Sequence, residues 1–279
     1  MDLSLVIVHY KAPDLLEQCI KSITAKYPEL RGHFVIVDNS PNKTSSRKIK
    51  KAFPKERYIP SRSNVGFAKA INWGIYNSDS KYILILNQDI IMRDDAIKKM
   101  YDFLESHSDA ALCAPKLIYT DGSIQPSCCR FYTPRVILYR RTWFGKLPFA
   151  KKSIETFTMA DYDHASTKEV DWVTGAAMMI RRRAIEKVGP MDERFFFYFE
   201  DVDWCRRFWE NGWRVVYLPE AQMTHYHSRE SAEKTGFWSL TTKMTRIHVQ
   251  SGIKYFLKYR KHKTAPREVF NKTKQKNNG

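Results

Sequence analysis

Short apolar runs alternate with amphipathic runs over the first hundred residues, and this alternation restricts the chain to few folds. Residues 3–10, 33–40 and 82–89 are β-rich runs of strand length. Residues 12–24 and 66–77, which lie between them, repeat apolar side chains with helical spacing. The run 82–89 is apolar on both faces, as in a central strand of a covered parallel sheet. Strands that alternate with helices form right-handed βαβ units, so we predict an α/β fold with a Rossmann-like, doubly wound, mostly parallel sheet flanked by helices.

The pattern is less regular after residue 94. Residues 96–107 have helical periodicity, and the following strand is expected to turn back at Asp121-Gly122. A helix over 201–210 should point Val202, Cys205, Phe208 and Trp209 inward and end at Asn211-Gly212. Residues 214–227 are typical of another strand. Residues 128–152 are basic and aromatic, and the sequence does not fix the elements within them.

The charge of the chain is unevenly distributed. The 279 residues carry 47 Lys and Arg against 30 Asp and Glu, a net charge of +17. Residues 240–279 hold eleven of the cations and one acid, which places +10 there. A hydrophobic content of 43% predicts a substantial globular core. The surface should therefore attract anions such as phosphates and lipid headgroups, and the C-terminal segment is electrostatically separate.

Cysteine usage and hydropathy indicate a cytoplasmic protein. The five cysteines show neither a CxxC pair nor zinc-finger spacing, which favours reduced thiols. The apolar run near the N-terminus lacks the basic start and cleavage site of a signal peptide. No run reaches the roughly 18 apolar residues that cross a bilayer. We expect any membrane contact to be peripheral.

Two acids follow strands at corresponding positions. Asp38 ends one apolar run and Asp89 ends another, and each alone would be a turn or helix-cap residue. Ligands of open α/β sheets bind beyond the carboxyl ends of the strands, so the two acids together indicate a site. Gly66 lies between them at a predicted helix start, where backbone can approach an anion closely. A tight turn capped by Asn64 explains that glycine equally well.

The order of these segments resembles glycosyltransferase family 2, the inverting enzymes of the GT-A fold, and within it the bacterial rhamnosyltransferase-like branch. The resemblance covers roughly residues 3 to 231. It rests on the stretches VIVHY, VIVDNS, NVGFAKAINWGI, ILILNQD, VDWVTGAAMMIRR, GPMDERFFFYFEDVDWCRR, GWRVVYLPEA and THYHSRES. It implies a GT-A domain over 1–238, with a nucleotide-binding half (about 1–95) and an acceptor-binding half (about 96–238). Residues 239–279 would form a basic amphipathic helix and a flexible tail.

The resemblance also implies a set of site residues. Asp38 would contact the nucleoside, and Asn64 and Gly66 would line the nucleotide pocket. Asp89 would be the metal-binding acid of the family's Asp-x-Asp position, although here the first acid is replaced by Asn87. The residues implied to bind the nucleotide sugar are Val8, Tyr10, Asp38, Asn64, Gly66, Lys69, Asn87, Gln88, Asp89, Trp172 and Gly175. Trp172 and Gly175 could instead serve core packing and a close backbone approach.

A metal site is implied at Asp89 and one histidine. His225 follows a predicted strand at the position of a metal-binding histidine in related enzymes, and His227 is its local rival. Mg²⁺ or Mn²⁺ is the expected ion, because these ions take hard oxygen ligands and share them with substrate phosphates. The loss of one acid at position 87 would weaken this site.

The segment FFFYFEDVDWCRR crowds three carboxylates behind a run of aromatic residues. Ionised groups cost several kcal/mol to bury without compensation, so the acids either cap a helix or face a site. Sugar transfer needs a base for the acceptor hydroxyl, and Asp201 matches the family's catalytic base. Glu200 would orient the acceptor, and Asp203 is the best candidate for a cap. The helix N-terminus should stabilise these anions and keep Asp201 unprotonated near neutral pH.

The C-terminal helix has a basic amphipathic pattern. Val249, Ile253, Phe256 and Leu257 share one side, with lysines around them, which suits an anionic membrane surface. A surface helix packed on the domain is the alternative. The cations of residues 128–152 favour the membrane, and beyond Thr264 we expect a mobile chain. The expected location is the inner face of the plasma membrane.

The expected partners are a dTDP-, UDP- or GDP-linked sugar and a glycan or polyprenyl-diphosphate-linked acceptor. Three other functions are considered. A sugar-1-phosphate nucleotidyltransferase would need a glycine-rich loop after the first strand, and residues 6–16 have none. A nucleic-acid binder would fit the charge, but no nucleic-acid motif is found. A sugar-nucleotide-binding relative without activity would fit the altered triplet at residues 87–89.

Overall fold

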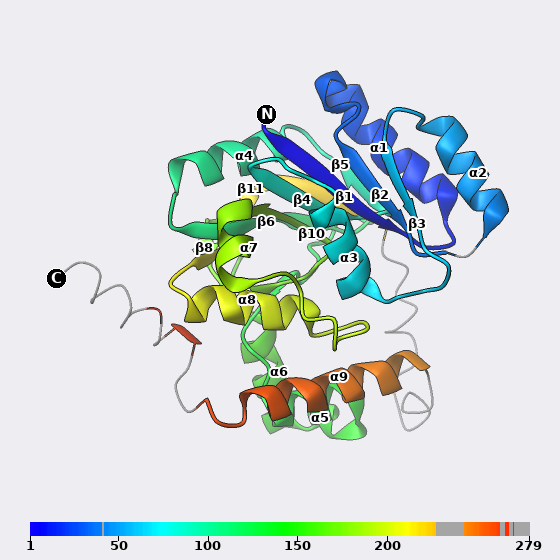
Figure 1. The fold of residues 1–279 in the computed structure, drawn as a ribbon. Helices are drawn as coiled ribbons and strands as arrows, with labels where there is room; N and C mark the ends of the chain where they lie inside the picture. The colour runs from blue at the N-terminus through cyan, green and yellow to red at the C-terminus, as the bar shows by residue number, and fades with distance from the viewer. Residues whose placement is uncertain (41, 227–242, 263–265, 268–269, 271–279) are drawn as a thin grey trace.

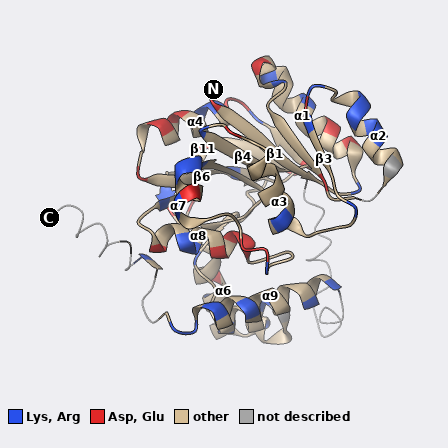
Figure 2. Ribbon diagram, in the orientation of Figure 1, with Lys and Arg blue, Asp and Glu red and all other residues tan. Residues whose placement is uncertain are grey.

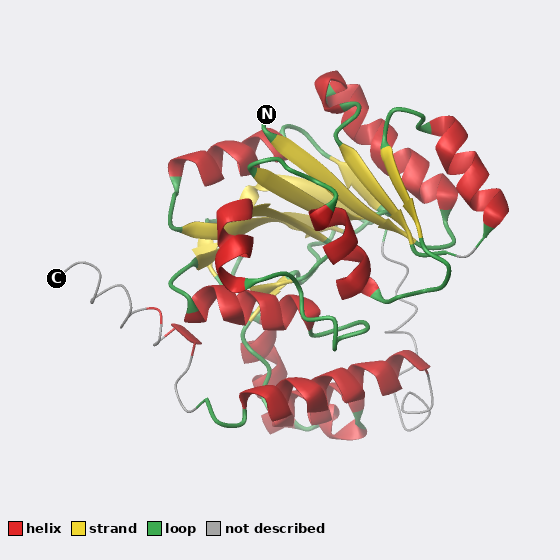
Figure 3. Ribbon diagram, viewed as in Figure 1, coloured by secondary structure: helices red, strands yellow, loops and turns green. Residues whose placement is uncertain are grey.

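The computed structural model describes residues 1–40, 42–226, 243–262, 266–267 and 270. Among them, nine strands form one mixed sheet in the order β3-β2-β1-β4-β10-β6-β11-β5, with β8 paired to β11. Helices cover both faces of this sheet, and a further group of helices lies at one end of the molecule (Figures 1 and 3). The α/β architecture expected from the sequence is confirmed, with a mixed sheet.

The N-terminal half is parallel, as predicted. The strands β1, β2, β3 and β4 pair in parallel register, with Ile7 beside Ile36 and Leu86. The helices α1, α2 and α3 connect them. These elements are β1 (Leu3–His9), α1 (Pro13–Lys26), β2 (Phe34–Asp38), α2 (Lys43–Ala52), β3 (Arg57–Pro60), α3 (Phe67–Tyr76) and β4 (Tyr82–Asn87). The carboxyl ends of β1, β2 and β4 thus meet at one edge, where Asp38 and Asn87 lie.

The second half departs from a doubly wound parallel sheet. Strand β10 inserts antiparallel between β4 and β6, while β6 and β11 run parallel to each other. The short β5 pairs antiparallel with the end of β11 and aligns His225 with Ile90. The elements here are β5 (Ile90–Met92), α4 (Ala96–Ser106), β6 (Ala110–Ile118), β8 (Lys168–Glu169), β10 (Ala177–Arg181), α7 (Arg182–Val188), α8 (Glu200–Glu210) and β11 (Arg214–His225). Because β10 runs antiparallel to both β4 and β6, the carboxyl end of β11 lies at the same end of the sheet as that of β4.

Two apolar cores lie on opposite faces of the sheet. Successive residues of β1 alternate between them, since Leu5 and Ile7 pack against α1 and α4 while Val6 packs against α3. Helix α8 belongs to the α3 face, where Val202, Cys205, Phe208 and Trp209 are buried as predicted. The predicted turn at Asp121-Gly122 is also confirmed, with Gly122 at φ +85°. All five cysteines are free and buried.

A helical group covers the end of α8 that carries the acids. It consists of α5 (Pro134–Arg141), the 3-10 turn η2 (Trp143–Lys146), α6 (Pro148–Thr158) and α9 (Lys243–Tyr259). The helices α5, α6 and α9 lie together at the bottom of the view in Figure 1. A two-stranded sheet of β7 (Cys128–Cys129) and β9 (Trp172–Val173) leads into this group. The boundary predicted at residues 238 and 239 stays a prediction, because residues 227–242 lie outside the described chain.

Helix α9 packs on the domain through Thr245, His248, Gly252 and Tyr255, and not through its apolar stripe. Ile253 and Leu257 therefore remain more than half exposed, so the stripe that was expected to face a membrane is left accessible. Beyond Thr264 a mobile chain was predicted, and most of those residues lie outside the described chain. Among the described ones, Phe270 is buried, with its ring 5.1 Å from that of Trp209 of α8.

Candidate active site

A cavity of about 300 Å³ lies between the end of β4, the end of β11 and the start of α8. We call it the central cavity. It brings together six residues that were predicted to share a site: Asn87, Trp172, Gly175, Glu200, Asp201 and His225. Residues more than 100 positions apart in the chain thus face one space.

The two acids of α8 are placed by a strained turn. Tyr198 and Phe199, directly before them, both have left-handed backbone, with φ of 68° and 70°. Such a conformation costs a non-glycine residue roughly 1–2 kcal/mol. Phe199 is 2% exposed and packs on Tyr132, His248 and Tyr255. Burying a phenylalanine contributes about 1.5–3 kcal/mol, so this packing offsets the strain of one such residue.

Asp201 is held as an acceptor at the cavity wall. The backbone amide of Gly175 donates to its Oδ2 at 3.1 Å, and the amide of Val202 donates to its Oδ1 at 2.8 Å. Burial raises the pKa of Asp201 to about 6, although these two hydrogen bonds oppose the shift. The carboxylate is therefore mostly ionised at neutral pH, and its pKa is close enough to neutral pH for it to accept a proton.

Glu200 behaves differently from its neighbour. It is 4% exposed, and its Oε2 has no hydrogen-bond partner among the described residues. Burial, together with the negative charge of Asp201, raises the pKa of Glu200 well above its usual value. The helix N-terminus was expected to keep these acids ionised. Burial outweighs that effect for Glu200, so of the two neighbouring carboxyls Glu200 holds a proton more readily than it would in water.

Asp203 is not a helix cap, contrary to the prediction. The N-cap residue of α8 is Phe199, which offers no side-chain cap. Asp203 is fully buried one turn further on, where it accepts hydrogen bonds from Arg207 at 2.9 Å, Lys258 at 2.5 Å and Tyr259 at 2.8 Å. Its role is to join α8 to α9. The sequence could not show this, because both partners on α9 are more than 50 residues away.

Asp89 lies beside His225, which lines the central cavity. The Nε2 atom of His225 is 3.2 Å from Asp89 Oδ1, and Nδ1 is 2.9 Å from Gln125 Oε1. An amide oxygen can only accept, so Nδ1 donates a hydrogen bond to Gln125, which leaves Nε2 as the ring atom turned toward the carboxylate. A carboxylate oxygen and an imidazole nitrogen are both groups that bind divalent ions. The pair therefore offers two ligands for such an ion, and the hydrogen bond from Nδ1 to Gln125 fixes the orientation of the ring.

The ion site is sparse. No cluster of three or more His, Cys, Asp or Glu suited to a metal is present in the part of the chain that the structure describes. Asn87, which stands where a further acid was expected, contributes an amide whose Nδ2 donates to His225 Nε2 at 3.4 Å. Gln88 points elsewhere and forms two hydrogen bonds with the backbone of Tyr10. His227 lies outside the described residues.

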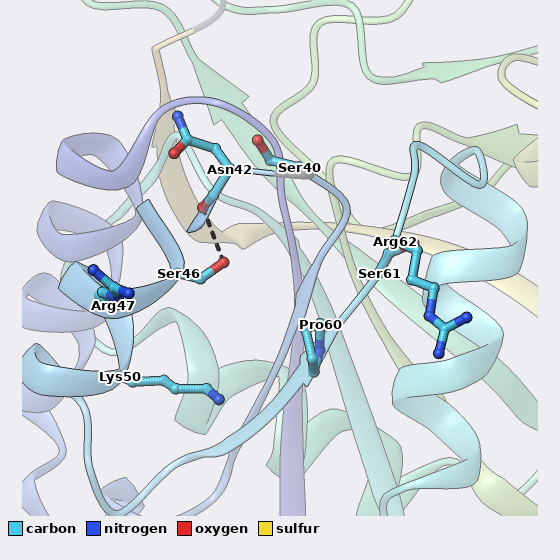
Figure 4. A pocket seen from close by; sticks show the side chains of 8 residues that line it. All are labelled: Ser40, Asn42, Ser46, Arg47, Lys50, Pro60, Ser61 and Arg62. Atoms are coloured by element: carbon cyan, nitrogen blue, oxygen red, sulfur yellow. Dashed lines mark hydrogen bonds between the residues drawn. The ribbon is translucent and has the colours of Figure 1, made fainter. Parts of the chain in front are cut away.

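Asp38 is fully buried at the end of β2. Its oxygens accept hydrogen bonds from the Ser40 amide at 3.0 Å, the Ser46 hydroxyl at 2.7 Å and the Tyr58 hydroxyl. Two of these partners, Ser40 and Ser46, line a separate cavity of about 430 Å³. Figure 4 shows that Arg47, Lys50 and Arg62 surround this cavity. Its cationic walls suit a phosphate-bearing ligand.

Asn64 and Gly66 shape the loop before α3. Asn64 accepts from the Gly66 amide at 2.9 Å and from Asn39 Nδ2 at 3.0 Å. Gly66 has φ +89°, and a Cβ there would lie 2.5 Å from the Phe196 carbonyl oxygen. Glycine is required for both reasons. The next amide, of Phe67, donates to that same oxygen at 2.8 Å, so the loop before α3 touches the segment that leads to Asp201.

The remaining predicted residues lie at different depths. Val8 is half-buried near the end of β1, and Tyr10 is exposed beyond it. Lys69 is half-exposed on α3, 3.7 Å from Glu193. Trp172 lines the central cavity and donates its indole N–H to the Arg130 carbonyl at 2.7 Å. Gly175 has no room for a larger side chain, because a Cβ would lie 3.1 Å from Phe67.

The aromatic wall of the central cavity includes three residues that sequence reasoning did not single out: Tyr132, Arg140 and His248. Tyr132 stacks near Trp172 and Phe199, and His248 of α9 contacts Tyr132 and Phe199. Arg140 of α5 donates to the Tyr132 hydroxyl at 2.7 Å and also lines the cavity. Such aromatic faces are suited to sugar rings, and Arg140 places a cation beside them. Tyr132 and Arg140 come from residues 128–152, within which the sequence did not define the elements.

A family comparison matches most of the chain. The profile described as "Glycosyl transferase family 2" matches residues 4–189. The N-acetylglucosaminyl-diphospho-decaprenol L-rhamnosyltransferase of Mycobacterium tuberculosis is 25% identical over 82% of this chain and 77% of its own length. The low-salt glycan biosynthesis hexosyltransferase Agl10 of Haloferax volcanii is 30% identical over 74% of this chain and 61% of its own. The Escherichia coli rhamnosyltransferase WbbL is 28% identical over 75% of this chain and 67% of its own length.

Solved structures support the fold. The mannosyltransferase PcManGT of Pyrobaculum calidifontis, in complex with GDP-Man and Mn²⁺, covers 97% of this chain and 68% of its own, with a TM-score of 0.58 and 14% identity. GalNAc-T7 with UDP, GalNAc and Mn²⁺ covers 84% of this chain, with a TM-score of 0.60 and 14% identity, but this chain spans only 46% of its length. Among the described residues, no helix has the length and apolar character required to span a membrane.

Proposed function

Because the chain belongs to glycosyltransferase family 2, we propose that it is an inverting transferase that moves a sugar from a nucleotide diphosphate to a cell-surface glycan acceptor. The observation that carries this proposal is the shared cavity. Asp201 and His225, the partner of Asp89, both line it. A base and a diphosphate-binding pair at one space are what a single displacement needs.

The donor would lie along the carboxyl edge of β1, β2 and β4. The cationic cavity of Arg47, Lys50 and Arg62 lies over Asp38 and suits the nucleotide end. Asp89 and His225 would hold Mg²⁺ or Mn²⁺ near the diphosphate, where the ion supplies charge neutralisation of the leaving group. The Asn64–Gly66 loop would fix the backbone between these two positions.

The acceptor would enter between α8 and the aromatic wall. The Asp201 carboxylate takes the proton of the acceptor hydroxyl, the hydroxyl oxygen forms a bond to the anomeric carbon, and the bond to the diphosphate breaks. Attack from the face opposite the leaving group inverts the anomeric centre. When Glu200 is protonated, which its raised pKa favours, it can donate one hydrogen bond to an acceptor oxygen without repelling the ionised base.

The relatives guide the choice of substrates. Two of the relatives compared are named as rhamnosyltransferases, and the name of one of them gives N-acetylglucosaminyl-diphospho-decaprenol as its acceptor. We therefore propose rhamnose as the first donor sugar to test, with a polyprenyl-diphosphate-linked glycan as acceptor. Work of this kind would take place at the inner face of the plasma membrane, with α9 on the membrane side.

The deciding experiment is a screen of dTDP-, UDP- and GDP-linked sugars for stabilisation of the protein and for release of the nucleotide diphosphate, with and without a chelator. We expect one donor to be preferred and the chelator to reduce turnover. Asp201→Asn should abolish transfer while it leaves nucleotide binding largely intact. Unimpaired turnover in that variant would remove Asp201 from its role, and stabilisation by no donor would refute the proposal as a whole.

A further inference from the structure

The outer face of the helical group combines exposed apolar side chains with unpaired cations. We define the α5–η2–α6 face by Leu138, Trp143, Phe144 and Phe149, which are 49%, 59%, 36% and 60% exposed. The rings of Trp143 and Phe144 stack at 4.2 Å, and Phe149 packs edge-on to Tyr139. Three exposed aromatic residues within seven positions form a patch of a kind that usually marks an interaction site.

The inner faces of the same elements explain why these side chains point outward. Val136, Ala150 and Phe157 are buried against the domain. A tight approach at Gly145, where a Cβ would lie 2.4 Å from the Tyr139 carbonyl oxygen, joins α5 to α6 through η2. The exposed aromatics therefore lie on the turn η2 between two anchored helices and at the start of the second one, and their exposure follows from the packing.

The charge of this face indicates an anionic partner. Residues 134–152 contain six Lys and Arg and no acid. Arg135, Lys146 and Lys152 are exposed, and none of them forms an ion pair with an acid of the described chain. By contrast, Lys254 and Lys258 of α9 are engaged with the domain, through the Arg194 carbonyl and through Asp192 and Asp203. Cations interleaved with aromatics match an anionic lipid surface, where rings enter the headgroup region and cations meet phosphates.

From this placement we infer that the α5–η2–α6 face docks on an anionic phospholipid bilayer and inserts Trp143 and Phe149 at the interface. Helix α9 extends the same surface, because Gly252 packs on Ile137 of α5 and leaves Ile253 and Leu257 exposed beside it. Figure 2 shows the Lys and Arg positions of α9 and of the helices behind it at this end of the molecule.

Docking on the membrane would serve the proposed function, and its purpose rests on that function. Arg140 and Phe157 of the same helices line the central cavity. Docking would hold the cavity mouth against the lipid headgroups, where the diphosphate of a polyprenyl-linked acceptor lies. The face thus connects the membrane to the catalytic acids through two helices.

The test is co-sedimentation of the full chain with vesicles of phosphatidylcholine, with and without phosphatidylglycerol. We expect binding to the anionic vesicles alone, weakened at high salt. The double variant Trp143→Ser/Phe149→Ser should lose at least about tenfold in affinity. Tyr76→Ser is the matched control, since Tyr76 is 65% exposed at the end of α3 and should bind as the wild type does. Unchanged melting temperatures would show that the variants fold.

A spectroscopic readout is independent of catalysis. Trp143 emission should shift to shorter wavelength with anionic vesicles, and Trp143→Phe should remove most of the shift while it retains most of the binding. Lack of wild-type binding, undiminished binding of the double variant, or equal salt-sensitive binding to duplex DNA would overturn the inference. Failure of the proposed function would appear differently, as absent donor turnover in detergent solution with vesicle binding intact.

Discussion

Replacing Asp201 with asparagine should stabilise the fold while it abolishes transfer. Burial raises the pKa of Asp201 from 3.8 to about 6. A shift of roughly two units corresponds to about 3 kcal/mol of unfavourable free energy for the ionised form above pH 6. Asparagine removes the charge but can accept at one oxygen only. One of the bonds from the Gly175 and Val202 amides is then lost, at a cost of about 1 kcal/mol.

The net gain is thus about 2 kcal/mol, or a rise in melting temperature of about 4–8 °C at neutral pH. The pH dependence follows from proton binding. Between pH values near 4 and 6 the native chain holds the Asp201 proton and the unfolded chain has lost it, so the free energy of unfolding falls as pH rises through this window. In Asp201→Asn this fall should be absent, so the two curves converge at low pH.

Asp203→Asn is the matched control, because the same substitution two positions away should have the opposite effect. It leaves Lys258 and Arg207 facing a neutral partner in a buried network. Breaking such a network costs about 3–5 kcal/mol. Thermal unfolding of both variants across pH, with donor binding as a folding check, measures these differences. A melting temperature of Asp201→Asn below wild type at about pH 8, or one that follows Asp203→Asn, would refute the reasoning.

Three further outcomes are expected. The kcat/KM of the wild type should fall about tenfold per pH unit below about 6 as Asp201 becomes protonated, and a flat profile down to about pH 5 would contradict this. Gly66→Ala should reduce kcat and donor affinity together, because its Cβ would displace the Phe196 carbonyl. Calorimetry of donor binding measures the loss of affinity. Gly32→Ala controls for backbone strain, because Gly32 has a φ of +90° with open space around it. Asp89→Ala should raise the metal concentration needed for half-maximal turnover by about tenfold or more, and an unchanged metal dependence would exclude Asp89 as a ligand.

Local sequence patterns predicted the helices and strands whose contacts are with neighbouring segments of the chain. The strands β1, β2 and β4 and the helices between them follow from periodicity, because parallel βαβ units are built from neighbouring segments. The direction of β10 could not be predicted in this way, since its pairing with β4 joins Met179 to Leu84 across 95 residues. The start of α8 was found from its acids, but their raised pKa values depend on burial. The packing of Tyr132, His248 and Tyr255 around the adjacent Phe199 joins distant segments, which no local spacing reveals.

The packed side of α9 was also beyond prediction. Periodicity grouped Ile253 and Leu257 as an apolar side, which is the usual buried one. The helix instead approaches through Gly252, because the aromatic Phe199 and the branched Ile137 leave room only for a small residue there. The predicted site residues after β2 and β4 were easier to place, since these strands run parallel and their carboxyl ends lie together.

The contacts of α9 have a consequence for how the enzyme is made. Its Ser251 hydroxyl donates to the Phe197 carbonyl, and Lys258 and Tyr259 reach Asp203, so α9 secures the segment on either side of Asp201. A nascent polypeptide still on the ribosome can already form the parallel strands β1 to β4, yet Asp201 gains these supports only once residue 259 has emerged.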